Sequence, residues 1–188
     1  MSTDFRKFVE HPRYGKGPHV TGLNPRGDFA TGVFLNWHSP EEVRIPGTAI
    51  AADLSRQTQA TLAVTHYFDT KRRCADCGQS FLFFAAEQKY WYEDLGFPLD
   101  SDCVRCVPCR KKQRGLDLQR QRYEELFHVH ERTSEQNRDL ALSALSLIES
   151  GAFGKRSLER VRSVLKMAGS SEDLKDLWER VHALESVG

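Results

Sequence analysis

The spacing of apolar residues is most regular toward the end of the chain. From residue 133 onward they recur every three or four positions, which is the periodicity of amphipathic helices. The sequence "TSEQ" at 133–136 matches a capping box ahead of the apolar run "LALSALSLIE". Ser157 and Ser170 precede two further runs of the same kind. We therefore expect a bundle of three helices over residues 133–188.

The central part of the chain mixes strand-like and helix-like patterns. β-Branched and aromatic residues alternate in "TLAVTHYFD", and "FLFF" follows after Gly78, so a hairpin is expected there. "AAEQKYWYEDLGF" has a helical composition, with Gly96 where a helix would end. The predicted elements are a helix over 49–60, strands over 61–69 and 81–84, a helix from Ala85 to Gly96, and a longer helix that begins at the last cysteines and bends near Gly115.

Residues 1–48 have a different pattern, because proline and glycine interrupt every apolar run. No helix or central strand can pass through "HPRYGKGPHVTGLNPRGD", so this segment is expected to be extended and rich in turns. Aromatic and basic residues are interleaved in it. Such an arm packs on its own domain or lies along a partner, and we favour the former.

These patterns together predict an α+β fold with three parts. Residues 1–48 form the extended arm, residues 49–132 form a cysteine-containing module with a helical extension, and residues 133–188 form the helical bundle. No stretch of the chain approaches the roughly 18 apolar residues that span a bilayer. The N-terminus is charged where a signal peptide would be apolar, so we expect a cytoplasmic protein without a membrane partner.

Five cysteines lie between positions 74 and 109, and in the cytoplasm such thiols are more often metal ligands than disulfides. "CADCG" and "CVPCR" are two C-x-x-C pairs, and each can place two thiolates on one edge of a zinc tetrahedron. Two alternatives remain open. Four cysteines also bind iron–sulfur clusters, and "CVPC" at a helix start resembles a thiol redox motif, although no βαβ pattern surrounds it.

The segment "CADCGQSFLFFAAEQKYWYEDLGFPLDSDCVRCVPCRKK" resembles the bacterial probable zinc-ribbon family, a treble-clef-type module. The resemblance implies structural Zn²⁺, and its R-C-x-x-C-R element falls on Cys106 and Cys109. Cys103 is then a spare thiol, either buried or able to exchange onto the metal. Pro108 and Arg110 also suit a turn that enters a helix. The predicted ligands are Cys74, Cys77, Cys106 and Cys109.

The sequence indicates less about the function than about the metal site. No catalytic or nucleotide-binding motif occurs, so an enzyme with a small-molecule substrate is disfavoured. The net charge is only +1, but basic residues gather between Arg105 and Arg122, which is typical of nucleic-acid or ribosome contact and also of a solvated helix face. A protein-interaction adaptor is an equal alternative. The nucleic-acid contact candidates are Arg13, Tyr14, Lys16, Arg72, Arg73, Arg110, Lys111, Lys112 and Arg114.

One further cluster has two interpretations. Glu87, Gln88, Trp91 and Tyr92 lie within one predicted helix, where they could form a ligand-binding surface or pack against the hairpin. We favour packing.

Overall fold

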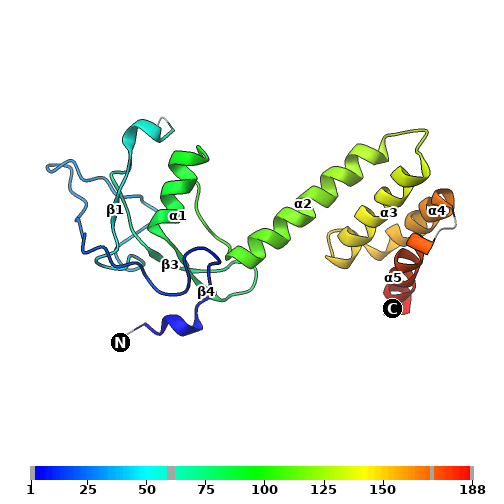
Figure 1. The fold of residues 1–188 in the computed structure, drawn as a ribbon, viewed down its shortest axis with the longest axis horizontal. Coiled ribbons are helices and arrows are strands. Elements are labelled where there is room, and N and C mark those ends of the chain that lie inside the picture. Colours follow the sequence, from blue (N-terminus) through cyan, green and yellow to red (C-terminus); the bar gives the residue numbers. More distant parts are fainter. Residues whose placement is uncertain (1–2, 59–61, 170–171, 187–188) are drawn as a thin grey trace. The chain divides into compact units, whose positions relative to one another are not determined.

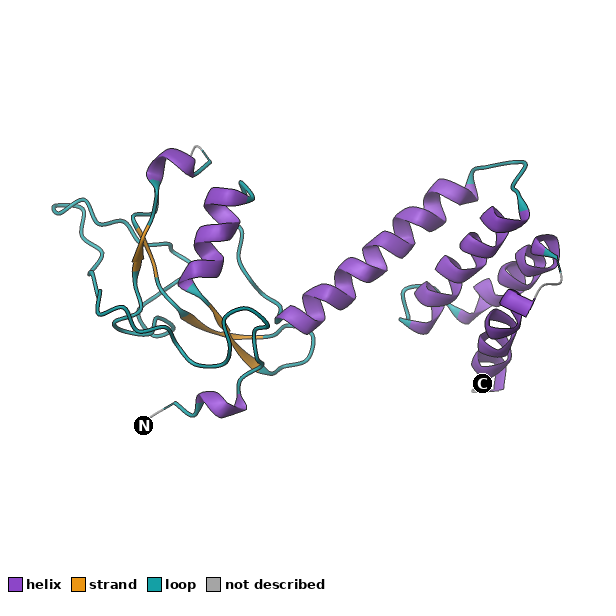
Figure 2. Ribbon diagram, viewed as in Figure 1, coloured by secondary structure: helices purple, strands orange, loops and turns teal. Residues whose placement is uncertain are grey.

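The computed structural model describes residues 3–58, 62–169 and 172–186. Contacts divide the chain into two compact units, Met1–Arg110 and Lys111–Gly188. The first unit contains short strands, turns and short helices, and the second is helical (Figures 1 and 2). This arrangement confirms the α+β class. The division into parts at residues 48 and 132 stays a prediction. The contacts place the arm and the cysteine-containing residues in one unit.

Two antiparallel strand pairs form the centre of the first unit. Strand β1 (Ile50–Ala51) pairs with β2 (His66–Tyr67), and β3 (Thr70–Arg73) pairs with β4 (Ser80–Phe83). In the second pair Thr70 lies opposite Phe83 and Arg73 opposite Ser80. The predicted hairpin is thus confirmed, although the expected strand over 61–69 is divided: its described part contributes only β2, and β3 begins just after it.

The helix expected over 49–60 is wrong for the described residues 49–58. This segment holds strand β1 and a single 3₁₀ turn, η2 (Leu54–Arg56), in which the Asp53 side chain accepts the Ser55 amide. Local composition favoured a helix, but the pairing of Ile50 with the buried Tyr67 provides contacts that an isolated helix could not make. Tertiary pairing therefore overrides the local preference.

The N-terminal arm packs on its own unit. After a 3₁₀ turn, η1 (Phe5–Lys7), Val9 forms a bridge to Phe81 of β4. The rings of His11, Tyr14 and His19 then gather within 5.1–5.7 Å of the buried Phe84 ring. The arm is extended and rich in turns, as expected, and these three rings pack around Phe84, whereas Phe29 and Trp37 of the same arm are exposed.

Helix α1 (Ala85–Lys89) follows β4 and continues as a π-helical turn, η3 (Tyr90–Asp94). Gly96 adopts φ 67°, a left-handed conformation that suits glycine at a helix end. Gln88 is buried and donates to the carbonyl groups of Phe68 and Phe83. Because Glu87, Gln88 and Tyr92 are all buried, they pack inside the unit and do not form an open ligand surface.

Helix α2 (Val107–Phe127) begins directly after Cys106, as predicted, and Leu126 is its one fully buried residue. The second unit then packs α3 (Ser134–Glu149), α4 (Leu158–Ala168) and α5 (Lys175–Ser186) around a core that includes Leu145, Leu165 and Val181, with the single turns η4 (Lys155–Ser157) and η5 (Glu172–Leu174) between them.

The capping box at Thr133 and Gln136 is present with both hydrogen bonds, and the three-helix prediction is confirmed. The helix start that the sequence predicts at Ser170 lies outside the described residues. Of the helices that the structure describes, none has the length and apolar character needed to cross a membrane.

Candidate metal centre

The first cysteine pair lies in the turn between β3 and β4. The Cys74 amide donates to the Gln79 carbonyl at 2.9 Å, and the Gly78 amide donates to the Cys74 carbonyl at 3.0 Å. Gly78 has φ 69°, which an L side chain rarely adopts, so glycine allows the chain to turn back here. The tight turn places Cys74 and Cys77 on the same side of the hairpin end.

The second pair lies at the start of α2, with Cys106 before the helix and Cys109 in its first turn. Two contacts join this pair to the first. The Ala75 amide donates to the Val104 carbonyl at 2.9 Å, and Arg105 pairs with Asp76 at 2.9 Å. Both cysteine turns are therefore held together by backbone and side-chain contacts outside the sulfur atoms.

The four predicted ligands come together in one cluster. The Sγ atoms of Cys74, Cys77, Cys106 and Cys109 all lie within 4.8 Å of one another, and those of Cys77 and Cys106 are 3.8 Å apart. A tetrahedral zinc ion with Zn–S bonds of about 2.3 Å requires sulfur–sulfur distances of about 3.8 Å. All five cysteines are free thiols. The donor set and its spacing therefore fit a single tetrahedral metal ion.

The electrostatics of the cluster also favour a cation. Burial opposes ionisation of Cys74, but hydrogen bonds from the backbone of Cys77, Cys106 and Asp76 lower the pKa of this thiol to about 6. A hydrogen bond with the Cys106 thiol, together with burial, raises the pKa of Cys109 to about 12. Four thiolates placed this close together repel one another, and a cation held among them would offset that repulsion.

Cys103 stands outside this cluster. Its side chain is buried and packs with Phe81, and its thiol donates to the Arg105 carbonyl at 3.5 Å. Burial raises the pKa of this thiol to about 12. Of the two roles that the sequence left open for Cys103, the structure favours a buried packing residue.

A buried charged cluster supports the start of α2. Arg110 donates from Nη2 to Glu87 Oε1 at 2.6 Å, and its guanidinium lies 5.0 Å from the centre of the Trp91 ring. His11 Nε2 approaches the same Glu87 oxygen at 3.3 Å, while His11 Nδ1 accepts the amides of Arg13 and Tyr14. Sequence reasoning missed this cluster, although Glu87 and Arg110 both belong to the pattern that carries the family resemblance.

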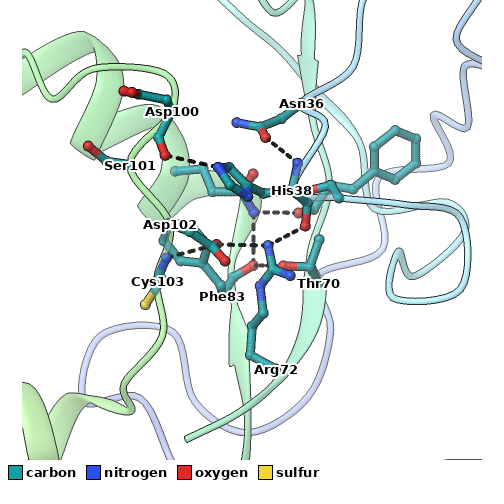
Figure 3. A network of polar contacts seen from close by, with 12 residues as sticks. Asn36, His38, Thr70, Arg72, Phe83, Asp100, Ser101, Asp102 and Cys103 are labelled. Carbon is teal, nitrogen blue, oxygen red and sulfur yellow. Dashed lines mark hydrogen bonds and ion pairs between the residues drawn. The ribbon is translucent and has the colours of Figure 1, made fainter. Parts of the chain in front are cut away.

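A second network holds the segment that leads into the second cysteine pair (Figure 3). Arg72 of β3 donates to the His38 carbonyl at 2.6 Å and pairs with Asp102 at 3.0 Å. Asp102 in turn accepts the Cys103 amide at 2.8 Å, and the His38 ring hydrogen-bonds the Asp100 carbonyl at 2.9 Å. These contacts fix residues 100–103 against the hairpin. No sequence motif indicated them.

The nucleic-acid contact candidates fall into two groups: those engaged in contacts inside the first unit and those that are exposed. Arg72, Arg110 and Tyr14 belong to the first group, and the other six belong to the second. Arg72 and Arg110 are largely occupied by the internal pairs just described, and Tyr14 is half-buried on Phe84. Arg13 is exposed and lies 5.7 Å from the Tyr90 ring centre, Lys16 lies 3.8 Å from Glu10, and Arg73 donates to the Gly78 carbonyl. Lys111, Lys112 and Arg114 are exposed on α2.

A hairpin knuckle, a short helix and a second cysteine pair at a helix start define a metal-binding treble-clef module. A family model described as a probable treble clef domain matches residues 68–116, which confirms the resemblance for this segment of the chain. The match includes both cysteine pairs and the first turns of α2. No curated protein and no solved structure matches the chain.

Proposed function

We propose that the chain is a non-enzymatic binding module whose four-cysteine site holds a structural zinc ion in a reducing, cytoplasmic compartment. Zinc suits four thiolates in a tetrahedron and has no redox chemistry of its own. The protein ligands occupy all four positions, so no open position is left for a substrate. A thiol redox role for Cys106 and Cys109 is disfavoured, because both sulfurs belong to the metal cluster.

We further propose that α2 contacts nucleic-acid phosphates. One observation carries this proposal: Lys111, Lys112, Arg114 and Arg120 are exposed, and among the described residues none of them has an ion-pair partner. Arg72 and Arg110 differ, because carboxylates already neutralise them. Unpaired cations on one exposed helix can neutralise phosphates and release counterions.

Salt-dependent binding tests this proposal. The protein is titrated with labelled single-stranded RNA of about 16 nucleotides and with a duplex, at about 50 mM and about 200 mM salt. We expect affinity to fall steeply with salt. The triple variant Lys111→Gln, Lys112→Gln, Arg114→Gln should reduce the slope of log affinity against log salt by about 2 for a single strand.

The matched control is a triple variant of exposed cations elsewhere in the second unit, Arg138→Gln, Arg156→Gln and Lys166→Gln, which removes the same charge. It should leave the slope nearly unchanged. Absence of binding at the lower salt concentration, or equal weakening by both triple variants, would overturn the proposal.

A protein-interaction adaptor is the second candidate function. The net charge of +1 gives little overall attraction to a polyanion. The first unit also exposes large apolar side chains that its own core does not use, including Phe29 and Trp37. Such residues are typical of protein-docking surfaces.

A further inference from the structure

Two adjoining cavities form a groove in the first unit, and no cysteine lines either of them. One cavity of about 360 Å³ is lined chiefly by apolar side chains: Phe29, Val33, Phe34, Leu35, Trp37 and Leu62. The other, of about 520 Å³, is more polar and includes Arg26, Glu41 and Phe68. Gly27 and Arg44 line both cavities. The groove therefore has an apolar end and a polar end, and Arg44 stands between them.

The apolar end is built on paired backbone. The Thr65 amide donates to the Phe34 carbonyl at 2.8 Å, and Leu35 forms a parallel bridge with His66. Side chains from both segments form the walls of the cavity, whereas Phe29 and Trp37 are 77% and 58% exposed. Exposing these rings to water is costly, and an apolar partner side chain would remove that cost.

Two contacts hold the Arg44 side chain in place. Its Nε atom donates to the Ser39 carbonyl, and its guanidinium lies 5.7 Å from the centre of the Phe68 ring. No carboxylate of the described residues forms an ion pair with it. A guanidinium fixed in this way presents its remaining N–H groups as a fork, the geometry that binds a carboxylate with two hydrogen bonds.

The charged residues that line the groove favour a ligand with one carboxylate over a polyanion. Arg26 and Arg44 line the groove together with Asp28 and Glu41, so cations and carboxylates are equal in number. A polyanion gains little from such a surface, whereas a single carboxylate placed at Arg44 gains one specific pair. Aliphatic walls at Val33, Leu35 and Leu62 also suit an apolar side chain better than a hydrogen-bonding base.

We propose that this groove docks a protein segment in which a large apolar side chain lies close to an aspartate or glutamate. The apolar side chain fills the cavity beside Trp37 and Phe34, and the carboxylate pairs with Arg44. This inference deepens the adaptor function and is independent of nucleic-acid binding by α2, which uses other residues.

The test is a selection of short random peptides displayed on phage, with the full-length, metal-loaded protein as bait and Trp37→Ser as the parallel bait. We expect the wild-type protein alone to enrich sequences that combine a large apolar residue with a nearby acidic residue. Enrichment of the same peptides on both baits, or no enrichment on the wild-type protein, would overturn the proposal.

The strongest peptide is then synthesised in two forms, with its acidic residue intact and with that residue as the amide. Trp37→Ser or Leu62→Ser should weaken binding of the acidic peptide by about tenfold or more. Arg44→Gln should weaken the acidic peptide but not the amide peptide, which isolates the carboxylate pair in a double-mutant cycle. Equal effects of Arg44→Gln on both peptides would contradict the assigned role of Arg44.

Two matched substitutions control for surface changes in the same unit. Val20→Ser removes an exposed apolar side chain and Arg56→Gln an exposed cation, and neither residue lines the groove. Both variants should bind the peptide like the wild-type protein, and the far-UV circular dichroism of every variant should be unchanged. Two results would assign the groove to another occupant and overturn the proposal: oligouridine binding that Trp37→Ser weakens, or self-association that Trp37→Ser abolishes.

Discussion

Arg110 and Glu87 form a 2.6 Å ion pair that joins the residue after the last cysteine to helix α1. Glu87 is buried, and its Oε1 atom is shared with His11 of the arm. Glu87 Oε2 and Arg110 Nε are buried without a hydrogen-bond partner. The pair therefore holds three segments together, and the cluster depends strongly on each of its members, since loss of one leaves a charge buried alone.

Arg110→Ala should destabilise the first unit by about 2–3 kcal/mol, because the Glu87 carboxylate then remains buried without its main partner. Urea unfolding of the metal-loaded protein, followed by tryptophan fluorescence in a Trp178→Phe background, measures this loss. Lys111→Ala is the control, since Lys111 is the exposed neighbour of Arg110 and its removal should change stability by less than about 0.5 kcal/mol. Equal effects of the two variants would contradict the role assigned to the pair.

The purified protein should contain about one zinc ion per chain by elemental analysis. Cys106→Ser should lose the metal, because three thiolates do not complete the tetrahedron. Cys103→Ser should retain it, since Cys103 lies outside the sulfur cluster. Retention of zinc by Cys106→Ser, or its loss from Cys103→Ser, would show that the ligands are wrongly assigned.

A strong chelator should unfold the first unit and leave the helices of the second intact. Structural zinc contributes about 10–16 kcal/mol of apparent binding free energy, which a unit with several small cores cannot replace. Heteronuclear NMR spectra should therefore lose the dispersed signals of β3 and β4 on chelation and keep those of α3–α5. A spectrum that retains both sets would mean that the metal is not needed for folding.

His11 should make stability depend on pH. Burial lowers the pKa of His11 below its ordinary value of 6.5, and the nearby Glu87 carboxylate only partly opposes this effect. The unfolded chain therefore binds more protons than the folded chain as the pH falls through about 6.5, so this contribution to stability is present above that pH and lost below it.

His11→Gln should flatten the fall in the free energy of unfolding between about pH 7.5 and about pH 5.5. His130→Gln, at an exposed position in the second unit, serves as the control. Acid also weakens metal binding in every variant, so the comparison depends on the difference in slope. Identical slopes for the wild-type protein and His11→Gln would refute the prediction.

Thr133→Ala should destabilise the second unit by about 1 kcal/mol. The substitution removes the hydroxyl that accepts the Gln136 amide at 3.2 Å, while the reciprocal bond from the Thr133 amide to the Gln136 side chain can remain. Hydrogen exchange should quicken at the first amides of α3. Ser134→Ala, one residue later and equally exposed, should have little effect on exchange at these positions.

The sequence predicted those features that depend on short spacings. The two C-x-x-C pairs, the glycine turn at Gly78, the end of the short helix at Gly96 and the capping box at Thr133 each depend on a few neighbouring residues. The resemblance to a treble-clef family extended this prediction over the intervening hairpin and helix. Local chemistry was sufficient because the same residues both specify the turn and carry the ligand or the cap.

Other features depend on partners distant in sequence. Arg72 and Arg110 were predicted as contacts to phosphate, yet Asp102 and Glu87 pair with them across gaps that no local pattern reveals. The segment at 49–58 has a helical composition, but β2 supplies the pairing that makes part of it a strand. A charge or a propensity can be read from one residue, whereas its neutralisation or its override depends on the tertiary structure.

The two ends of the sulfur cluster differ in access to water, since Cys74 and Cys106 are buried and Cys77 is exposed. Cys109 is only partly exposed, so an oxidant or a competing thiol-rich protein would reach a zinc ion held here most readily from the Cys77 side. Removal of the metal should begin with detachment of the Cys77 sulfur. The rate of zinc transfer would then depend on this one sulfur atom, whereas the affinity for zinc depends on all four sulfur ligands.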